Sequence, residues 1–231
     1  MPIPLTEILA GERHGRGITA SPPFAVVTME LQRGVMGDLA SFPALRQAAD
    51  EVGLPHHAGQ LARHARLLGL PVVHCTAEFR ADRAGTLTNT PLHAAVLRRA
   101  DHLLKGTAAI ELISELGPEA GDLIVPRRHG VSPFSGTALD ATLRNLGVSV
   151  LLVTGVSVNL GVLGLAIEAV NLGYQVVVAT DAVCGFPVDY AQAVLAESLS
   201  LIATLARTED LLEAMTTAAS SGTGSVEGNA L

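Results

Sequence analysis

The amino-acid sequence predicts an α/β fold, a three-layer α-β-α sandwich around a six-stranded parallel sheet. Three observations lead to this fold class. Short runs rich in Val and Leu alternate with helical patterns along most of the chain. Each run is continuously apolar instead of alternating between apolar and polar residues, as expected for strands buried on both faces. The repeated strand-helix-strand order favours parallel pairing, with the connecting helices covering the sheet.

The first three predicted strands are apolar runs followed by polar residues. They are FAVVTME at 24–30, PVVHCT at 71–76 and DLIVP at 122–126. A helical pattern spans 43–68 and stops at Gly69, because glycine readily adopts the left-handed backbone that ends helices. The polar stretch 80–91 predicts a long loop, and 108–116 predicts a short helix before the third strand.

The second half of the chain supplies the other three strands. They are SVLLVTG at 149–155, YQVVVATDA at 174–182 and SLIATLART at 200–208. Helices are expected at 135–147, 159–172, 187–199 and 208–215. Ser135 or Thr137 can cap the first of these helices and Gly147 can end it. Thr208 is a candidate cap for the last helix.

Size and composition favour one domain. The chain has 231 residues, of which 48% are hydrophobic, and a chain of this length can bury most of its surface around one core. We predict a single domain at 1–215 and a disordered tail at 216–231, because that tail is small and polar. The net charge of −7 argues against a nucleic-acid partner. No apolar run reaches membrane-spanning length without glycine or polar breaks.

The cysteine count indicates a reducing environment. Cys75 and Cys184 are too few for a disulfide framework and lack metal-ligand spacing. The amino-terminal residues have no long apolar core, so we expect no secretory signal and a cytoplasmic location. The histidines show no pattern of a metal site. We therefore predict neither a metal nor a cofactor.

In an open parallel sheet, ligands bind beyond the carboxyl ends of the strands. Those ends hold Glu30, Arg127, Arg128, the turn at 154–161 and Asp181. Glu30 suits a general acid or base, although a helix cap or an ion pair explains it equally well. An arginine after the third strand can bind a carboxylate through two parallel hydrogen bonds, or form a surface salt bridge. The turn offers backbone N–H groups at a helix start, and Asp181 is expected to be structural.

Three blocks of the sequence resemble the isochorismatase-like hydrolase superfamily, which includes nicotinamidases, N-carbamoylsarcosine amidohydrolases and isochorismatases. The blocks are AVVTMELQ at 25–32, RHGVSPFSGTALDATLRNLGVSVLLVTGVSVNLGV at 128–162 and AIEAVNLGYQVVVATDA at 166–182. Their order and spacing cover roughly residues 22–213. The resemblance implies the isochorismatase-like sandwich, a small-molecule substrate and a homodimer or homotetramer.

The family's amidases use an Asp, a Lys and a Cys, and the resemblance implies that all three positions differ here. Glu30, two residues before Gln32, falls on the Asp. Arg128, four residues before the Ser-Pro-Phe motif at 132–134, falls on the Lys. Gly161 falls on the Cys, and a residue without a side chain cannot form the family's thioester. The resemblance therefore implies an atypical member without the catalytic cysteine.

The resemblance also implies which residues contact the substrate. The family has a cis peptide in this turn, and the matching bond is Val156–Ser157. We expect Ser157 and Asn159 of the turn, together with Gln32 and Phe134, to bind the substrate. True isochorismatases also have Gly at the Cys position and protonate a vinyl ether. They carry an aromatic residue and a His where this chain has Ser157 and Asn159, so isochorismate itself is not the expected substrate.

Three functions are compatible with this pattern. The first is a cysteine-independent hydrolase of a small anionic or amide-like metabolite. In it, Glu30 is the general acid or base, Arg128 binds an anionic group and the 157–161 amides stabilise an oxyanion. The second is a non-catalytic binding protein on the same fold. The third is an amidase with a displaced nucleophile such as Cys184. We favour the first, because an inert scaffold has no need of both a carboxylate and a cation.

Overall fold

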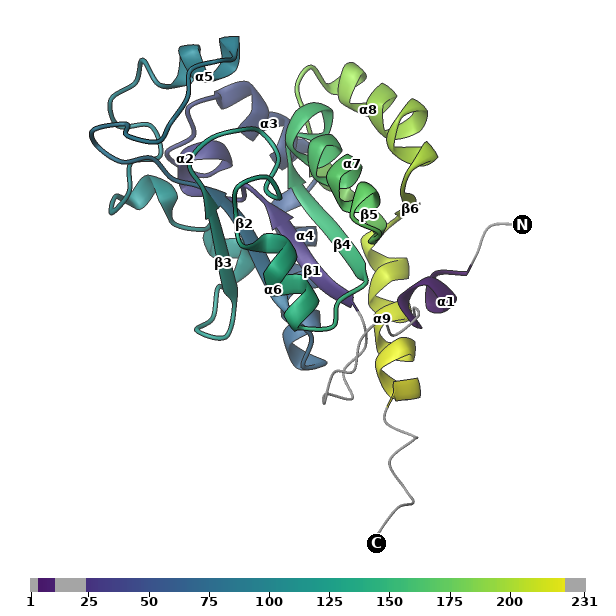
Figure 1. Cartoon of the computed structure of the whole chain (residues 1–231). Coiled ribbons are helices and arrows are strands. Elements are labelled where there is room, and N and C mark those ends of the chain that lie inside the picture. The colour runs from purple at the N-terminus through teal and green to yellow at the C-terminus, as the bar shows by residue number, and fades with distance from the viewer. Residues whose placement is uncertain (1–3, 11–23, 223–231) are drawn as a thin grey trace, which may run out of the picture.

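The computed structural model describes residues 4–10 and 24–222. Within this part of the chain, six parallel strands form one sheet in the order β3-β2-β1-β4-β5-β6, as the sequence predicts (Figure 1). The strands are β1 (Phe24–Met29), β2 (Val72–Ala77), β3 (Leu123–Arg127), β4 (Val150–Val156), β5 (Gln175–Cys184) and β6 (Thr204–Ala206). Strand β1 lies inside the sheet, β2 and β3 extend it to one edge, and β4, β5 and β6 then extend it from β1 to the other edge.

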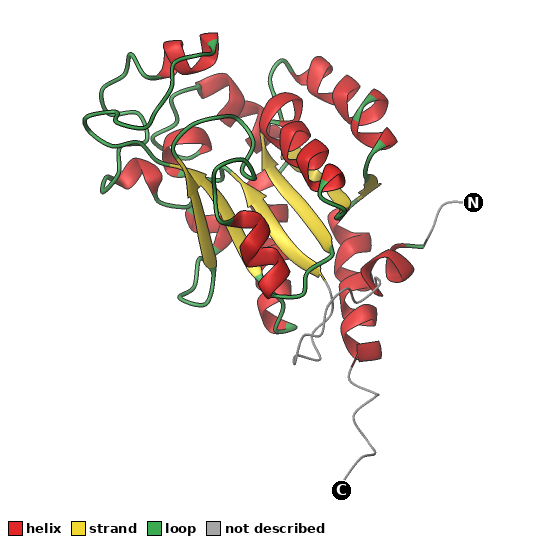
Figure 2. Cartoon of the chain, viewed as in Figure 1, coloured by secondary structure: helices red, strands yellow, loops and turns green. Residues whose placement is uncertain are grey.

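Helices cover both faces of the sheet (Figure 2). The α-helices are α1 (Leu5–Ala10), α2 (Arg33–Met36), α3 (Pro43–Glu51), α4 (Leu54–Leu67), α5 (Pro91–Val96), α6 (Leu139–Asn145), α7 (Leu163–Asn171), α8 (Val188–Glu197) and α9 (Thr208–Gly222). Helices α1, α3, α4 and α9 contribute to one apolar cluster, and α6, α7 and α8 contribute to the other. The sheet lies between these two clusters, which makes the three layers that the sequence predicts.

Strand β1 shows why the strands read as continuous apolar runs. All six of its residues are buried. Phe24 and Val26 pack into the cluster on one face, whereas Ala25 and Val27 pack into the cluster on the other. Successive side chains of a strand point to opposite faces, so a strand covered on both sides needs apolar residues at every position.

Several element boundaries differ from those expected. The 43–68 pattern is two helices, α3 and α4, because Gly53 adopts a left-handed backbone with φ 71° between them. The segment 108–116 forms two 3₁₀ turns, Ala108–Ile110 and Ser114–Leu116, in place of one helix. The helix predicted at 159–172 begins as a π-helical turn, η3 (Val158–Val162), and continues as α7.

The predicted tail at 216–231 is wrong in its first part, because α9 continues to Gly222. Met215 is fully buried in a core cluster, and the Thr216 hydroxyl donates to the Leu212 carbonyl at 2.9 Å. Burial of Met215 and Ala218 in the core cluster stabilises a helix that the small, polar sequence did not indicate. Residues 223–231 lie outside the described part of the chain.

Asp181 and Thr208 join the end of β5 to the start of α9. The Thr208 backbone N–H and hydroxyl both donate to Asp181 Oδ1, at 2.9 and 2.8 Å. Asp181 is therefore the structural hydrogen-bonding residue that we predicted. Thr208, the candidate cap, is the first residue of α9.

Two features of the described residues concern membranes and metal ions. Across 4–10 and 24–222, none of the helices combines the length and apolar character needed to span a membrane. Over the same residues, no group of three or more His, Cys, Asp or Glu side chains is placed to hold a metal ion.

Candidate active site

A cavity of about 420 Å³ opens at the carboxyl ends of β1, β3 and β4. Its polar lining residues are Glu30, Arg127, Ser157 and Asn159. The remaining lining residues are Val35, Phe42, Pro43, Ala44, Leu45, Leu92, Val131, Val156, Leu160, Gly161 and Phe186. Both its place in the sheet and its size are typical of small-molecule sites in doubly wound folds.

Glu30 follows β1 directly and lies in the cavity wall with 17% of its side chain exposed. Its backbone is left-handed, with φ 52°, a conformation that costs a non-glycine residue energy and recurs at functional sites. The Glu30 N–H donates to the Cys75 carbonyl of β2 at 2.8 Å, which holds the bend in place. One Glu30 oxygen forms an ion pair with Nη2 of Arg127.

The structure brings Arg127, rather than the predicted Arg128, to the carboxylate. Arg127 is the last residue of β3, is paired with Ala77 of β2, and is 9% exposed. Arg128 is exposed and lines a separate cavity at the outer edge of β3 with His129. Alternation along the strand explains the difference, because buried Val125 places residue 127 on the inner side and residue 128 on the outer side.

Two further residues predicted to bind the substrate lie elsewhere. Gln32 is completely buried; its Nε2 donates to the carbonyls of Ala77 and Ile110 at 2.9 and 3.1 Å. Its Oε1 accepts from the Ala77 N–H at 2.7 Å, so the amide ties the end of β1 to the end of β2. Phe134 is 7% exposed and packs in the core with Tyr174, at 5.8 Å between ring centroids. Neither residue lines the cavity.

The turn after β4 forms one wall of the cavity, as predicted. The Val156–Ser157 peptide bond is cis. The Ser157 carbonyl accepts from the N–H groups of Leu160 and Val162 at 3.1 and 3.0 Å, which starts the helix. Asn159 also lines the cavity, and its buried Oδ1 has no hydrogen-bond partner among the described residues.

The Met29 side chain packs closely against Gly161, where a side chain at position 161 would otherwise lie. A Cβ atom added at Gly161 would lie 2.9 Å from Met29 Cε and 3.1 Å from the Val156 carbonyl oxygen. Real Cβ contacts are longer than this, so a side chain at 161 requires the Met29 methyl group to move.

His93 on α5 is a residue of this region that the sequence analysis missed. It is 4% exposed, and its Nδ1 lies 3.0 Å from the Thr90 hydroxyl oxygen. Burial lowers the pKa of His93, and the neighbouring Arg127 charge lowers it further, while hydrogen bonding to the Gly130 backbone opposes the shift. His93 is therefore close enough to the Arg127 and Glu30 charges for them to affect its pKa, but it does not line the cavity. The signal was present as Thr90-Pro91, a typical helix start, within a segment that we predicted to be a loop.

Neither cysteine is placed to act as a nucleophile in this cavity. Cys75 is 1% exposed, and burial raises the pKa of its thiol to about 12. Burial also raises the pKa of the Cys184 thiol to about 12, and its Sγ lies 3.9 Å from the Leu45 carbonyl oxygen. Neither residue lines the cavity, so the structure does not support a displaced nucleophile at Cys184.

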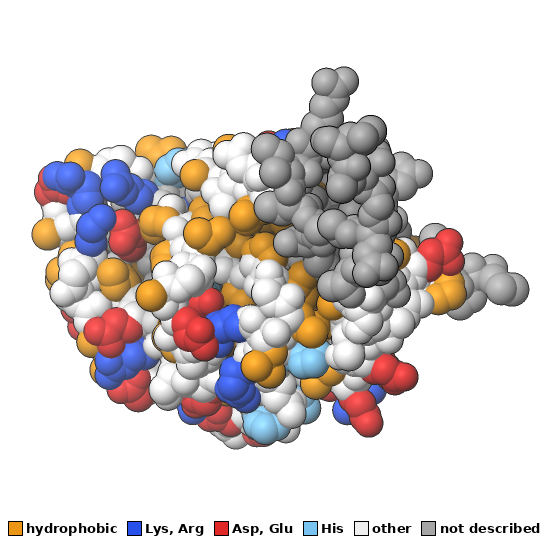
Figure 3. Space-filling view, turned by 90° about the horizontal axis from the view of Figure 1, so that it is seen from below, with side chains coloured by type: hydrophobic (Ala, Val, Ile, Leu, Met, Phe, Trp, Pro, Cys, Tyr) orange, Lys and Arg blue, Asp and Glu red, His pale blue; other side chains and the backbone are white. Residues whose placement is uncertain are grey.

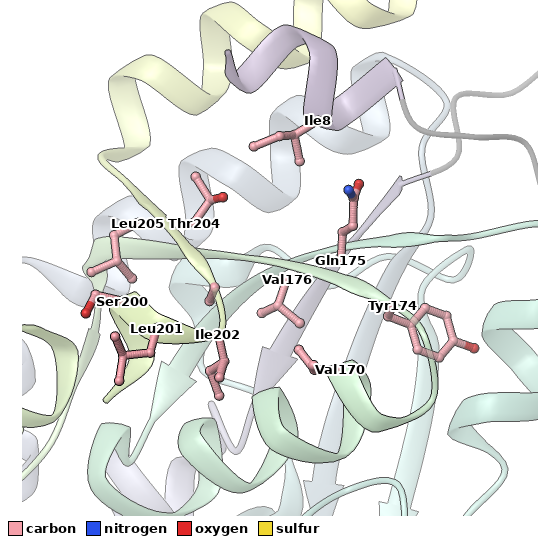
Figure 4. Close-up of a pocket in the computed structure, with 11 residues that line it drawn as sticks. Ile8, Val170, Tyr174, Gln175, Val176, Ser200, Leu201, Ile202, Thr204 and Leu205 are labelled. Atoms are coloured by element: carbon pink, nitrogen blue, oxygen red, sulfur yellow. The ribbon is translucent and has the colours of Figure 1, made fainter. Parts of the chain in front are cut away.

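A larger cavity, of about 730 Å³, lies at the opposite, amino end of β5 and β6. Figure 4 shows its lining, which comes from α1, α7, β5 and the segment before β6. None of the described residues that line it is acidic or basic, and the Tyr174 hydroxyl donates to Asp140 Oδ1 at 2.8 Å. Seen from this end, the molecule has apolar side chains near its middle with charged ones around them (Figure 3). The described lining of the larger cavity thus offers hydroxyl groups but no carboxylate, imidazole or cation.

Relatives of known sequence match parts of the chain. YwoC of Bacillus subtilis, an uncharacterized isochorismatase family protein, is 36% identical over 103 residues, 45% of this chain and 54% of YwoC. YecD of Escherichia coli O157:H7, also an uncharacterized isochorismatase family protein, is 33% identical over 162 residues, 68% of this chain and 78% of YecD. The ureidoacrylate amidohydrolase RutB of Variovorax paradoxus is 39% identical over 80 residues. The chain thus matches about half of the length of YwoC and 31% of the length of RutB.

Solved structures share the fold. An isochorismatase family protein from Burkholderia thailandensis is 25% identical with a TM-score of 0.69, over 87% of this chain and 98% of that chain. Another from Desulfovibrio vulgaris is 28% identical with a TM-score of 0.71, over 84% and 98%. The family model of the isochorismatase domain matches residues 24–210, which include every strand and the whole lining of the candidate site. The chain therefore belongs to the isochorismatase domain family.

Proposed function

We propose that this protein is a cysteine-independent hydrolase of a small amide-like metabolite, with Glu30 as its general acid and base. The observation that carries the proposal is the Glu30 carboxylate, which lines an open cavity at the carboxyl ends of the strands. The relative RutB is named as a ureidoacrylate amidohydrolase, which favours hydrolysis of an amide-like bond. Because the match spans 31% of RutB, its substrate is not transferred to this chain.

The chemistry requires water as the nucleophile. Glu30 accepts a proton from a water molecule, and the hydroxide oxygen attacks the carbonyl carbon of the substrate. Negative charge then develops on the carbonyl oxygen beside Arg127 and the backbone of the 157–161 turn, where electrostatic stabilisation is most effective. The carbon–nitrogen bond breaks, and Glu30 returns the proton to the leaving nitrogen. The products are a carboxylic acid and an amine.

Independence from cysteine rests on two observations. Gly161 stands where the family resemblance places the nucleophile, and Met29 occupies the adjoining space. Both thiols of the chain are buried, and neither belongs to the cavity lining. A covalent thioester therefore has no sulfur atom from which to form in this cavity.

A non-catalytic binding protein is the second candidate, and one observation favours it. The Glu30 and Arg127 charges already neutralise each other in the ion pair. A carboxylate held in this way must still exchange a proton with water to act as a base. Turnover, as distinct from binding, is therefore the property to measure.

The test is hydrolysis of a panel of small amides and ureido compounds by wild type and by Glu30→Gln, followed by mass spectrometry of the products. We expect Glu30→Gln to lower kcat by about 100-fold or more, because general acid–base catalysis contributes at least that much. Glu197→Gln, on the exposed surface of α8, is the matched control and should retain activity. Iodoacetamide should leave wild-type activity unchanged.

Either of two results would contradict this function. Full activity of Glu30→Gln would remove the proposed base. Binding of panel compounds without any turnover by the wild type would select the non-catalytic protein instead.

A further inference from the structure

The less exposed lining of the cavity, here called its floor, holds the Glu30–Arg127 pair beside apolar residues such as Val35 and Val156. The exposed lining, here called its mouth, has four apolar side chains, and this division bears on what the cavity accepts. Building on the proposed function, we infer that the substrate is a neutral molecule with an apolar aryl or alkyl substituent, and that anionic substrates are disfavoured. The reacting carbonyl group lies at the Glu30–Arg127 floor, and the substituent lies between side chains at the mouth. The inference concerns binding, so it can be tested whether or not the site turns over.

The charges on the floor do not suit an anion. Of the described residues that line the cavity, Arg127 is the one basic residue and Glu30 the one acidic residue, and they pair with each other. Arg127 uses Nη2 for Glu30, and its buried Nε has no hydrogen-bond partner among the described residues, so a donor remains for a substrate group. A substrate carboxylate bound there would place a second negative charge beside Glu30 in one partly buried site. Like charges at short range in such a site are strongly unfavourable. A neutral carbonyl group can accept a hydrogen bond there without breaking the ion pair.

The mouth is apolar although it faces solvent. Phe42, Leu92, Leu160 and Phe186 line the cavity and remain 43%, 39%, 40% and 53% exposed. They come from four separate segments: the residue before α3, helix α5, turn η3 and the loop before α8. Convergence of exposed apolar side chains on one concave surface marks a binding site, whereas single exposed apolar residues are ordinary.

The concave shape selects a small molecule as the occupant. The four side chains surround a cavity of about 420 Å³ that continues down to polar groups. A flat apolar patch would suit another protein, but a hollow of this size matches a compact ligand with one polar end. Contact between two copies of the chain is the alternative occupant of the mouth.

The experiment measures binding to purified full-length protein by isothermal titration calorimetry. The probes are methyl ketones and carboxylates of matched shape, acetophenone against benzoate and 2-octanone against octanoate. Ketones cannot be hydrolysed, so the measurement is independent of turnover. We expect each ketone to bind at least tenfold more tightly than its carboxylate partner. From 2-butanone to 2-octanone, affinity should rise about fourfold for each added methylene that is buried.

Variants at the mouth supply the second measurement. Phe42→Ala and Phe186→Ala should each weaken acetophenone binding about tenfold while 2-butanone binding changes little, because the lost area contacts the substituent. Leu201→Ala is the matched control, because Leu201 is 80% exposed and lines the other cavity. Circular dichroism of each variant verifies that it is folded.

Three outcomes would overturn the inference. Carboxylates that bind as tightly as the ketones would show that the site does not discriminate against negative charge, and an alkyl series with constant affinity would show that the mouth does not contact the substituent. Mouth variants that dissociate an oligomer in light scattering, with unchanged ketone affinity, would assign the apolar mouth to contact between copies. Tight ketone binding without hydrolysis of any matched amide would instead leave the inference standing and contradict the proposed function.

Discussion

The two ends of the sheet each carry a cavity, and the smaller one has the charged side chains among its described lining residues. The amino-end cavity measures about 730 Å³ and is lined by α1, α7, β5 and the segment before β6, without acidic or basic side chains among the described residues (Figure 4). The carboxyl-end cavity measures about 420 Å³ and gathers Glu30, Arg127, Ser157 and Asn159. The cavity with the larger volume is therefore not the candidate active site.

The difference follows from the direction of the strands. All strands of a parallel sheet end at the same edge, so the residues just after β1, β3 and β4 meet there although they are far apart in sequence. At the opposite edge, the chain arrives from the carboxyl ends of helices and packs apolar residues such as Val176 against Ile202 and Leu205. The carboxyl ends of the strands bring charged and polar side chains together, whereas apolar side chains pack at the amino ends of β5 and β6.

The largest expected effect would come from breaking the ion pair at the carboxyl end. We expect Arg127→Leu to destabilise the protein by about 3 kcal/mol, because it leaves the Glu30 carboxylate partly buried without its cation. We also expect at least about 100-fold lower kcat/KM. Urea unfolding and kinetics check the two parts.

Arg128→Leu is the matched control for this change. It alters the same residue type one position later, on an exposed side chain, and should cost less than about 0.5 kcal/mol. A larger loss of stability or activity for Arg128→Leu than for Arg127→Leu would show that the family resemblance, and not the alternation along β3, identifies the functional arginine.

A smaller effect concerns pH, and it arises beyond the carboxyl end of β2. His102 stacks on Phe79, and its Nδ1 lies 3.0 Å from the Ser41 hydroxyl oxygen. Burial, with Arg83 and Arg99 nearby, lowers the pKa of His102 to about 4. The unfolded chain takes up this proton near the ordinary histidine pKa of 6.5, so this contribution to stability is full above that pH and falls as the pH drops toward about 4.

His102→Gln tests that dependence. We expect the free energy of unfolding of the wild type to lose about 2 kcal/mol more than that of the variant between pH 7 and pH 4. Urea titrations across this range measure the difference. Parallel curves for the two proteins would mean that His102 does not contribute to acid sensitivity.

The smallest effect is expected at the amino end. Val170 is 39% exposed and lines the larger cavity, so Val170→Ala should change the unfolding free energy by less than about 0.5 kcal/mol. Its kcat/KM should stay within about twofold of the wild type. A strong loss of activity would move part of the function to the amino end and break the comparison.

The sequence correctly predicted features that are determined by the residues of a single segment, such as a strand or the turn after it. Mostly apolar runs identify all six strands, because the central strands are covered on both faces and most of their side chains pack into one of the two core clusters. Glu30 and the 154–161 turn line the cavity because they directly follow strands that end at its floor. The cis bond at Val156–Ser157 agrees with the family resemblance.

The errors concern side chains whose role depends on a partner from elsewhere in the chain. Gln32 follows a strand end like Glu30, but its amide is used by the backbone of Ala77 and Ile110. The choice between Arg127 and Arg128 required the pairing of β3 with β2, which fixes which one faces inward. His93 could not be predicted from the sequence, because only the fold brings α5 near the Glu30 and Arg127 charges.

The contact between Gly161 and Met29 has a consequence for how such a site could change over generations. Substitutions at the two positions are expected to be epistatic, because a cysteine at 161 meets the Met29 methyl group at 2.9 Å from its Cβ. A lineage that first shortened residue 29 would open the space, and a later thiol could then enter it. The reverse order would place the thiol in a crowded position, so one mutational path to a cysteine enzyme is easier than the other.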